Sequence, residues 1–305
     1  MLYGTRLIPI LFMLLLPLSL FAAQPDPSKL QLASVNAMIV DLNSDRVLYQ
    51  KRADAVVPIA SVSKLMTALV TLDADLPMDE RIPIEVHDSI QMQNVYSRVR
   101  IGSELPRREV LQLALMASEN RAATALAHAY PGGYFAFVRA MNRKARELGM
   151  NSTRFVEPTG LSSFNVSTAR DLQRLIQAAR KYPQIRRMTT ASKLDARFRR
   201  PRHVLAFFNT NRLVNSADWN IELSKTGYTD AAGRCLVLLS RIDGHEIAMV
   251  FLNSFGKRSH IGDAVRVRRW LETGTGGDVP RSARRYEQEQ NRIGRSALLL
   301  ADKSR

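Results

Sequence analysis

Short apolar runs predict β-strands near both ends of the chain. Residues 36–40 and 46–50 flank a polar segment rich in Asp and Asn, which favours a hairpin. Residues 221–228 predict a further short strand. Residues 235–242 and 246–253 predict two buried strands joined at an Asp-Gly pair, a strong hairpin signal.

Between these strands, apolar residues recur at helical spacing. Helices are predicted over 110–117, 121–130, 134–148 and 167–181, and a last one over 259–271. The chain thus passes from strands through a helical middle to strands and a helix. This order predicts an α+β fold, in which an antiparallel sheet is flanked by helices and carries an inserted all-helical lobe.

The two ends of the chain differ from its middle. Residues 1–23 combine Arg6, a proline-interrupted apolar stretch and small residues, which predicts a secretory signal peptide; a retained N-terminal anchor is the alternative. Residues 272–305 are polar and charged, and we expect a basic flexible tail with one short helix at most. Residues 24–271 are then the folded domain.

The formal net charge of the 305 residues is +16. A basic chain can bind nucleic acid, an anionic envelope polymer or a membrane surface. Basic residues are not interleaved with aromatic ones and no zinc-finger spacing occurs, so no nucleic acid is expected as a partner. Two explanations of the positive charge stay open: a solvated basic face, and a weak association with membrane or wall.

The single cysteine, Cys235, lies in an apolar run and is interpreted as a buried strand residue. The five histidines are scattered and form no metal-binding spacing. A Cys-His nucleophile is therefore disfavoured, and we expect no metal and no cofactor.

One short segment has the residues for nucleophilic catalysis. Ser61 and Lys64 are three positions apart, so on a helix they share a face. A serine hydroxyl needs an adjacent base, and a lysine can be that base only if burial or a nearby cation lowers its pKa. Lys225 could supply this cation. The segment alone is short enough to occur by chance.

Two further motifs follow in order, Ser118-Glu119-Asn120 and Lys225-Thr226-Gly227. The first falls between two predicted helices, where Ser118 could relay a proton or simply cap a helix. The Asn120 amide both donates and accepts hydrogen bonds, which suits a peptide substrate. The ordered set S-x-x-K, S-x-N and K-T-G is typical of penicillin-binding proteins and class A β-lactamases.

On these motifs, the chain resembles low-molecular-mass penicillin-binding proteins of the serine D-Ala-D-Ala peptidase family. The similarity covers roughly residues 33–271, and segments 209–213 and 225–229 resemble the D-alanyl-D-alanine endopeptidase branch. The carboxypeptidase branch usually carries a second β-rich domain, which does not fit after residue 271. The resemblance implies a periplasmic enzyme that cleaves D-Ala–diaminopimelate cross-links of peptidoglycan and is acylated by β-lactams.

The resemblance also implies a role for each motif residue. Lys64 takes the proton of Ser61, which attacks the D-Ala carbonyl, and Ser118 passes a proton to the departing amine. The backbone N–H groups of Ser61 and Tyr228 hold the oxyanion. The substrate is bound by the remaining motif residues: Asn120, Lys225, Thr226 and Gly227.

Three alternatives remain beside the endopeptidase. One is a D-alanyl-D-alanine carboxypeptidase that trims pentapeptide stems. Another is a β-lactamase, but Glu157, the nearest candidate for a deacylating glutamate, has a Glu-Pro-Thr-Gly context that does not match. We therefore expect slow release of bound penicillin. The last is a non-catalytic wall-binding protein. The intact set of motifs argues against it.

Overall fold

The computed structural model describes residues 25–85, 92 and 95–303, and side chains up to residue 293. The predicted signal peptide lies outside the described residues. No helix among the residues described has the length and apolar character needed to cross a membrane.

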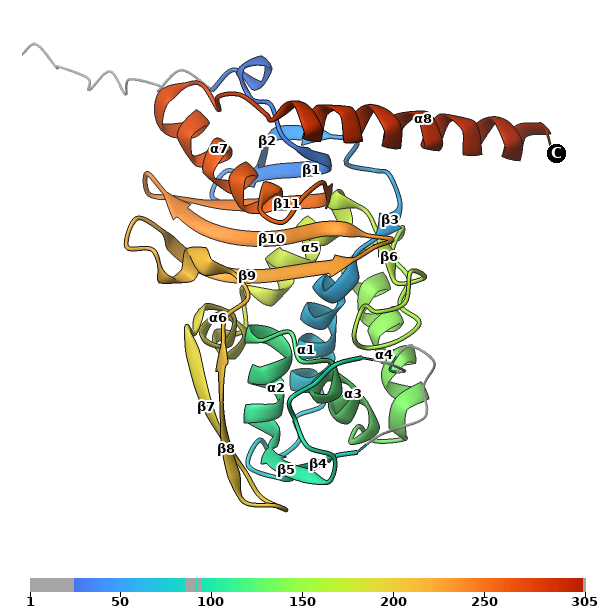
Figure 1. Ribbon diagram of the computed structural model, residues 1–305, viewed down its shortest axis with the longest axis vertical. Helices are drawn as coiled ribbons and strands as arrows, with labels where there is room; N and C mark the ends of the chain where they lie inside the picture. Colours follow the sequence, from blue (N-terminus) through green and yellow to red (C-terminus); the bar gives the residue numbers. More distant parts are fainter. Residues whose placement is uncertain (1–24, 86–91, 93–94, 304–305) are drawn as a thin grey trace, which may run out of the picture.

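A five-stranded antiparallel sheet forms the upper part of the molecule in Figure 1. Its strands, in spatial order, are β2 (Arg46–Lys51), β1 (Ser34–Asp41), β11 (His245–Ser254), β10 (Gly233–Ile242) and β9 (Asn220–Thr229). The pairing of β1 with β11 joins the two predicted hairpins across the length of the chain, with Met38 opposite Val250. The strand with the third motif, β9, is an edge strand.

Both faces of the sheet are covered, which explains why its central strands are continuously apolar. Successive residues of a strand point to opposite faces. Val237 packs in the core shared with the helical lobe, whereas its neighbours Leu236 and Leu238 pack against Trp270 of α7 (Ser259–Thr273). Cys235 is fully buried in β10, as predicted.

Most of the helical lobe lies below the sheet in Figure 1, whereas its helix α5 (Ala169–Ala179) lies behind the strands. Its helices are α1 (Lys64–Asp73), α2 (Arg107–Met116), α3 (Asn120–His128), α4 (Gly133–Glu147), α5 (Ala169–Ala179) and α6 (Pro183–Thr190). Thr168 caps α5 by accepting a hydrogen bond from the Asp171 N–H at 3.0 Å. Ser118 lies in the predicted break between α2 and α3.

Small two-stranded sheets complete the lobe. They are β3 (Val57–Pro58) with β6 (Val166–Ser167), β4 (Arg81–Ile84) with β5 (Ser103–Pro106), and β7 (Lys193–Phe198) with β8 (His203–Phe208). Short 3-10 turns occur at η1 (Pro27–Lys29), η2 (Ala60–Ser63) and η4 (Arg212–Asn215). The arginine-rich residues 197–202 lie at the turn of the β7–β8 hairpin, which the sequence analysis did not predict.

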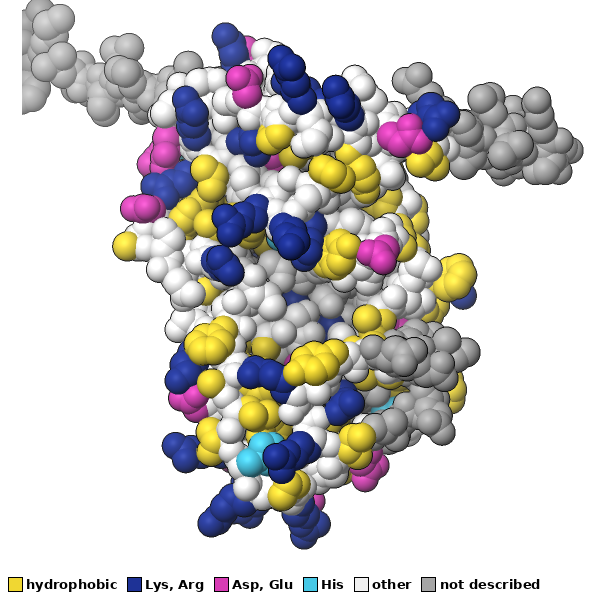
Figure 2. Space-filling model, viewed as in Figure 1, with side chains coloured by type: hydrophobic (Ala, Val, Ile, Leu, Met, Phe, Trp, Pro, Cys, Tyr) yellow, Lys and Arg dark blue, Asp and Glu magenta, His cyan; other side chains and the backbone are white. Residues whose placement is uncertain are grey.

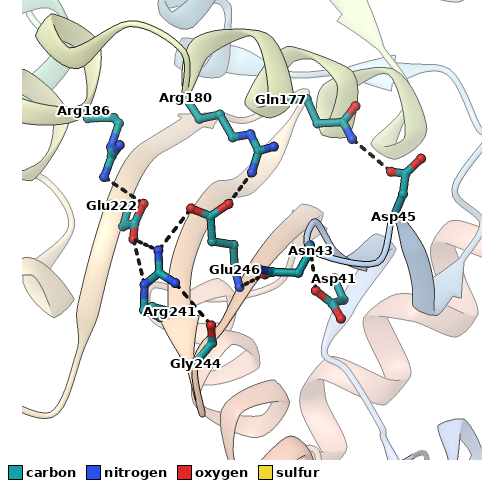
Figure 3. Close-up of polar contacts among 10 residues, drawn as sticks. All are labelled: Asp41, Asn43, Asp45, Gln177, Arg180, Arg186, Glu222, Arg241, Gly244 and Glu246. Carbon is teal, nitrogen blue, oxygen red and sulfur yellow. Dashed lines mark hydrogen bonds and ion pairs between the residues drawn. The ribbon is translucent and has the colours of Figure 1, made fainter.

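An ion-pair network ties the start of β9 to the rest of the fold (Figure 3). Glu222 of β9 pairs with Arg186 of α6 at 2.9 Å and with Arg241 of β10 at 3.1 Å. Arg241 also reaches Glu246 of β11 at 3.2 Å, and Glu246 pairs with Arg180 just after α5. The network therefore holds three strands and two helical segments together. One of these strands is β9, which carries Lys225.

The C-terminal segment differs from the flexible tail that we expected. Residues Arg281–Lys303 form one helix, α8, which begins against the sheet. Ala283 is buried with Ala33, Tyr286 donates to Asn253 Oδ1 at 2.5 Å, and Glu287 pairs with Lys51. These partners are distant in the sequence, so local composition did not reveal them.

Candidate active site

The seam between sheet and lobe brings the three motifs together. Figure 2 shows a hollow across the middle of the molecule, between these two parts. Ser61 lies in the turn η2, and Lys64 is the first residue of α1. The Lys64 ammonium nitrogen, Nζ, lies 2.8 Å from Ser61 Oγ, 2.7 Å from Asn120 Oδ1 and 2.6 Å from the Thr159 carbonyl oxygen.

These contacts suit a neutral Lys64 amine. A neutral lysine amine has two hydrogens and one lone pair. Two carbonyl oxygens, those of Asn120 and Thr159, accept both hydrogens because neither oxygen can donate. The lone pair is then directed at the hydroxyl of Ser61. In this orientation the neutral amine can accept the hydroxyl proton.

Electrostatics near Lys64 match this geometry. Lys64 is fully buried, and burial lowers its pKa from 10.5 to about 8, while the charges of Glu157 and Glu119 oppose the change. A base is most effective when its pKa is near the working pH. The sequence left open whether burial or a nearby cation lowers the pKa of Lys64. The structure gives burial as the cause.

Lys225 contacts the serine of the second motif. Its Nζ donates to Ser118 Oγ at 2.9 Å and to the Thr226 carbonyl oxygen at 2.8 Å. Burial and then the charge of Lys64 hold the pKa of Lys225 well below its usual value. The two buried amines repel one another when both are charged, which favours the neutral form of Lys225.

The edge strand β9 runs directly against the Ser61 turn. A Cβ added at Gly227 would lie 3.0 Å from the Ser61 nitrogen and 3.1 Å from the Ile59 carbonyl oxygen, so any side chain there would push the Ser61 turn away by a few tenths of an ångström. Tyr228 follows Gly227 on the strand, and its side chain is stacked under Arg234 at 3.9 Å. The predicted oxyanion donors, the N–H groups of Ser61 and Tyr228, thus belong to backbone segments in contact.

Two functional contacts were not predicted. Thr210, just before η4, shares a 2.6 Å hydrogen bond with Thr226 Oγ1, so the two hydroxyls form a pair beside Lys225. The Thr159 carbonyl is a backbone acceptor, which no side-chain motif can reveal. Its neighbour Gly160 was visible in the sequence, and its φ of +83° is one that glycine adopts readily.

Glu157 is placed differently from a deacylating base. Its carboxylate is buried and accepts hydrogen bonds from the N–H groups of Thr159 and Gly160 and from the Thr159 hydroxyl. These contacts lie within its own loop. Among the described residues, no group of three or more His, Cys, Asp or Glu side chains could hold a metal ion.

Fold and site together define a serine peptidase with the fold of the penicillin-binding enzymes. The chain belongs to the D-alanyl-D-alanine carboxypeptidase family, whose model matches residues 21–256. This family accounts for the α+β fold, the helical lobe and the order of the motifs.

Curated relatives agree with this assignment. The chain is 52% identical to D-alanyl-D-alanine endopeptidases of Escherichia coli, over 88% of this chain and 87% of that protein, and of Pseudomonas aeruginosa, over 87% and 86%. Among solved structures, a Streptomyces DD-transpeptidase matches with a TM-score of 0.75 at 26% identity, covering 80% of this chain and 98% of that one. A Listeria monocytogenes penicillin-binding protein with bound cefotaxime matches with a TM-score of 0.69 at 27% identity and the same coverage.

Proposed function

We propose that this enzyme is a DD-endopeptidase that hydrolyses D-Ala–diaminopimelate cross-links of peptidoglycan through an acyl-enzyme on Ser61. The observation that carries the chemistry is the buried Lys64 amine, held by two carbonyl oxygens and directed at the Ser61 hydroxyl. The preference for cross-links is supported by 52% identity to two endopeptidases, against 30% to a carboxypeptidase of Bacillus subtilis.

Acylation begins when Ser61 Oγ attacks the D-Ala carbonyl carbon and its proton passes to Lys64. The carbonyl oxygen gains the negative charge and accepts hydrogen bonds from the N–H groups of Ser61 and Tyr228. Such a donor is typically worth about 10²–10³ in rate. Because β9 is an edge strand, its free side can accept an extended peptide as an additional strand.

The C–N bond then breaks, and the departing amine needs a proton. Ser118 lies on the Lys225 side of the site and accepts a hydrogen bond from Lys225 at 2.9 Å. The Ser118 hydroxyl passes its proton to the amine and is reprotonated through the lysine amines. Water subsequently attacks the ester on Ser61, with Lys64 again as the base.

The group beside the scissile bond is a carboxylate in both candidate substrates. Thr226, its partner Thr210 and the Lys225 amine offer hydrogen-bond donors to it. Asn120 contacts Lys64 through its oxygen, so its NH₂ is directed elsewhere and suits the substrate backbone. Gly227 keeps β9 close enough to Ser61 for these groups to act on one peptide.

β-Lactams present a strained amide and a carboxylate in the same relation, so we propose that they acylate Ser61. The Glu157 carboxylate is occupied by its own loop, which is consistent with slow deacylation. The signal-like residues 1–23 support export to the periplasm, where the substrate lies. The positive net charge supports a weak attraction to the anionic wall or membrane.

A carboxypeptidase is the second candidate, because the matching family model carries that description. Purified muropeptides separate the two. The enzyme should convert cross-linked dimers to monomers, whereas a Ser61→Ala control should leave them intact. Trimming of monomeric pentapeptides with dimers untouched would overturn the endopeptidase assignment.

A further inference from the structure

One buried carboxylate in the site has no part in the proton transfers described above. Glu157 is 1% exposed and lies in the loop that passes alongside α1. Consecutive carbonyls of this loop accept hydrogen bonds from α1 side chains: Pro158 O from Thr67 at 2.7 Å, and Thr159 O from Lys64 at 2.6 Å. The loop is therefore a wall of the Lys64 site.

Glu157 and Lys64 contact opposite ends of the same peptide group. The Gly160 N–H donates to Glu157 Oε1 at 2.6 Å, and the Thr159 carbonyl of that peptide accepts from Lys64 Nζ at 2.6 Å. In a trans peptide the N–H and C=O point in opposite directions, so carboxylate, peptide and amine form one chain of hydrogen bonds. Such chains are cooperative, because each bond polarises the next.

The second carboxylate oxygen fixes the preceding peptide, Pro158–Thr159, and the Thr159 side chain. Glu157 Oε2 accepts from the Thr159 N–H at 2.6 Å and from the Thr159 hydroxyl at 2.5 Å. Gly160 then packs against the Ser61 turn so closely that a Cβ there would lie 1.9 Å from the Ala60 carbonyl oxygen. The loop has no room to shift toward the nucleophile, and Glu157 prevents it from moving away.

We propose that Glu157 is a positioning residue that acts through the Thr159–Gly160 peptide to hold the Lys64 amine in line with Ser61 and to adjust its basicity. The proposal rests on the proposed roles of Ser61 and Lys64. It assigns to Glu157 a function in acylation, in contrast to the deacylating role of a β-lactamase glutamate.

Charges around Lys64 agree with this role. Two acidic groups act on it, Glu157 in the loop and Glu119 at the start of α3, and the ionisable amine of Lys225 on β9 feels its charge in turn. Burial lowers the pKa of Lys64 to about 8, and Glu157 is first among the charges that oppose this. Without Glu157 the pKa of Lys64 would fall further, so the amine would be a weaker base, neutral over a wider pH range.

The test is the pH dependence of acylation by benzylpenicillin, measured for the full chain. In Glu157→Gln the rate at high pH should fall by about 10–100-fold, because a displacement of about 1 Å can cost this much. The inflection of the pH profile should also move to lower pH. A structural role alone would lower the rate without moving the inflection, and that result would overturn the proposal.

Glu119→Gln is the matched control. It removes a negative charge that acts on Lys64. Among the residues that the structure describes, the Glu119 carboxylate accepts from the Arg121 N–H at 3.0 Å and not from the Thr159–Gly160 peptide. Its inflection should move to lower pH while the high-pH rate is retained. An equal loss of rate in both variants would contradict the positioning role.

Glu157→Asp keeps the test decisive if Glu157→Gln does not fold. It retains the charge with a shorter side chain, so the high-pH rate should fall while the inflection stays closer to that of the native enzyme. An unchanged rate in Glu157→Asp would refute the proposal. Failure of the proposed function itself would look different, because a Ser61→Ala variant would then still be acylated.

Discussion

The contact between Gly160 and the Ser61 turn leads to a sharp prediction about Gly160→Ala. The new methyl carbon would lie 1.9 Å from the Ala60 carbonyl oxygen and 2.2 Å from its carbon. Both partners are backbone atoms, which no rotamer change can remove. The residue would also have to keep a φ of +83°, which alanine disfavours.

The size of the effect follows from this overlap. Relief to an ordinary van der Waals separation requires a shift of about 1.5 Å between the loop and the Ser61 turn. The Thr159 carbonyl, which holds Lys64, moves with the loop. A misplacement of about 1 Å can cost 10²-fold in rate, so acylation should fall by roughly 10²-fold or more. The free energy of unfolding should fall by about 1–3 kcal/mol from the overpacking.

Stopped-flow acylation by a chromogenic cephalosporin and thermal unfolding measure the two effects. Gly274→Ala is the matched control, since Gly274 has a φ of +79° but a Cβ added there would have no atom of the described residues within 4 Å. It should lose about 1 kcal/mol of stability and none of the acylation rate. If Gly160→Ala acylates as fast as Gly274→Ala, the loop does not position Lys64.

Three further outcomes are expected. The acylation rate of the native enzyme should rise with pH through about 8, because the pKa of Lys64 is lowered to that value and only its neutral form accepts a proton; a flat profile from about pH 6 to 10 would contradict this. Ser118→Ala should slow acylation by about 10²-fold or more, since the departing amine loses its proton donor; a rate equal to the native one would remove Ser118 from the mechanism. Arg241→Ala should lower the free energy of unfolding by about 1 kcal/mol, because Glu222 and Glu246 each keep one other arginine, while the acylation rate stays the same; a thermal melt and the same kinetic assay would check both.

Much of the fold was predictable because its signals are local. The Asp-Gly turn between β10 and β11 and the apolar spacing of the lobe helices gave the α+β arrangement. The hairpin of β7 and β8 was missed because its turn, at residues 199–202, has no Asn-Gly or Asp-Gly pair to signal it. Helix α8 was underestimated because its contacts, such as Tyr286 with Asn253, join residues far apart in the chain.

The site was predictable as far as it consists of motif side chains. Ser61, Lys64, Ser118, Asn120 and Lys225 could be placed in one pocket from the order of the motifs, and the structure brings them within hydrogen-bonding distance of one another in two groups. Backbone contributions could not be predicted. The Thr159 carbonyl and the close approach of Gly160 depend on how the loop folds against α1, which residue types alone do not specify.

The central claim is that a neutral Lys64 amine makes Ser61 the nucleophile, and peptide mapping by mass spectrometry after exposure to benzylpenicillin tests it most directly. Lys64→Met fills the same buried site without a base and is the variant to compare. The account predicts one penicilloyl group on the Ser61 peptide of the native enzyme and an unmodified Ser61 in a folded Lys64→Met variant. An adduct on another residue, or equal modification of Ser61 in both proteins, would contradict it.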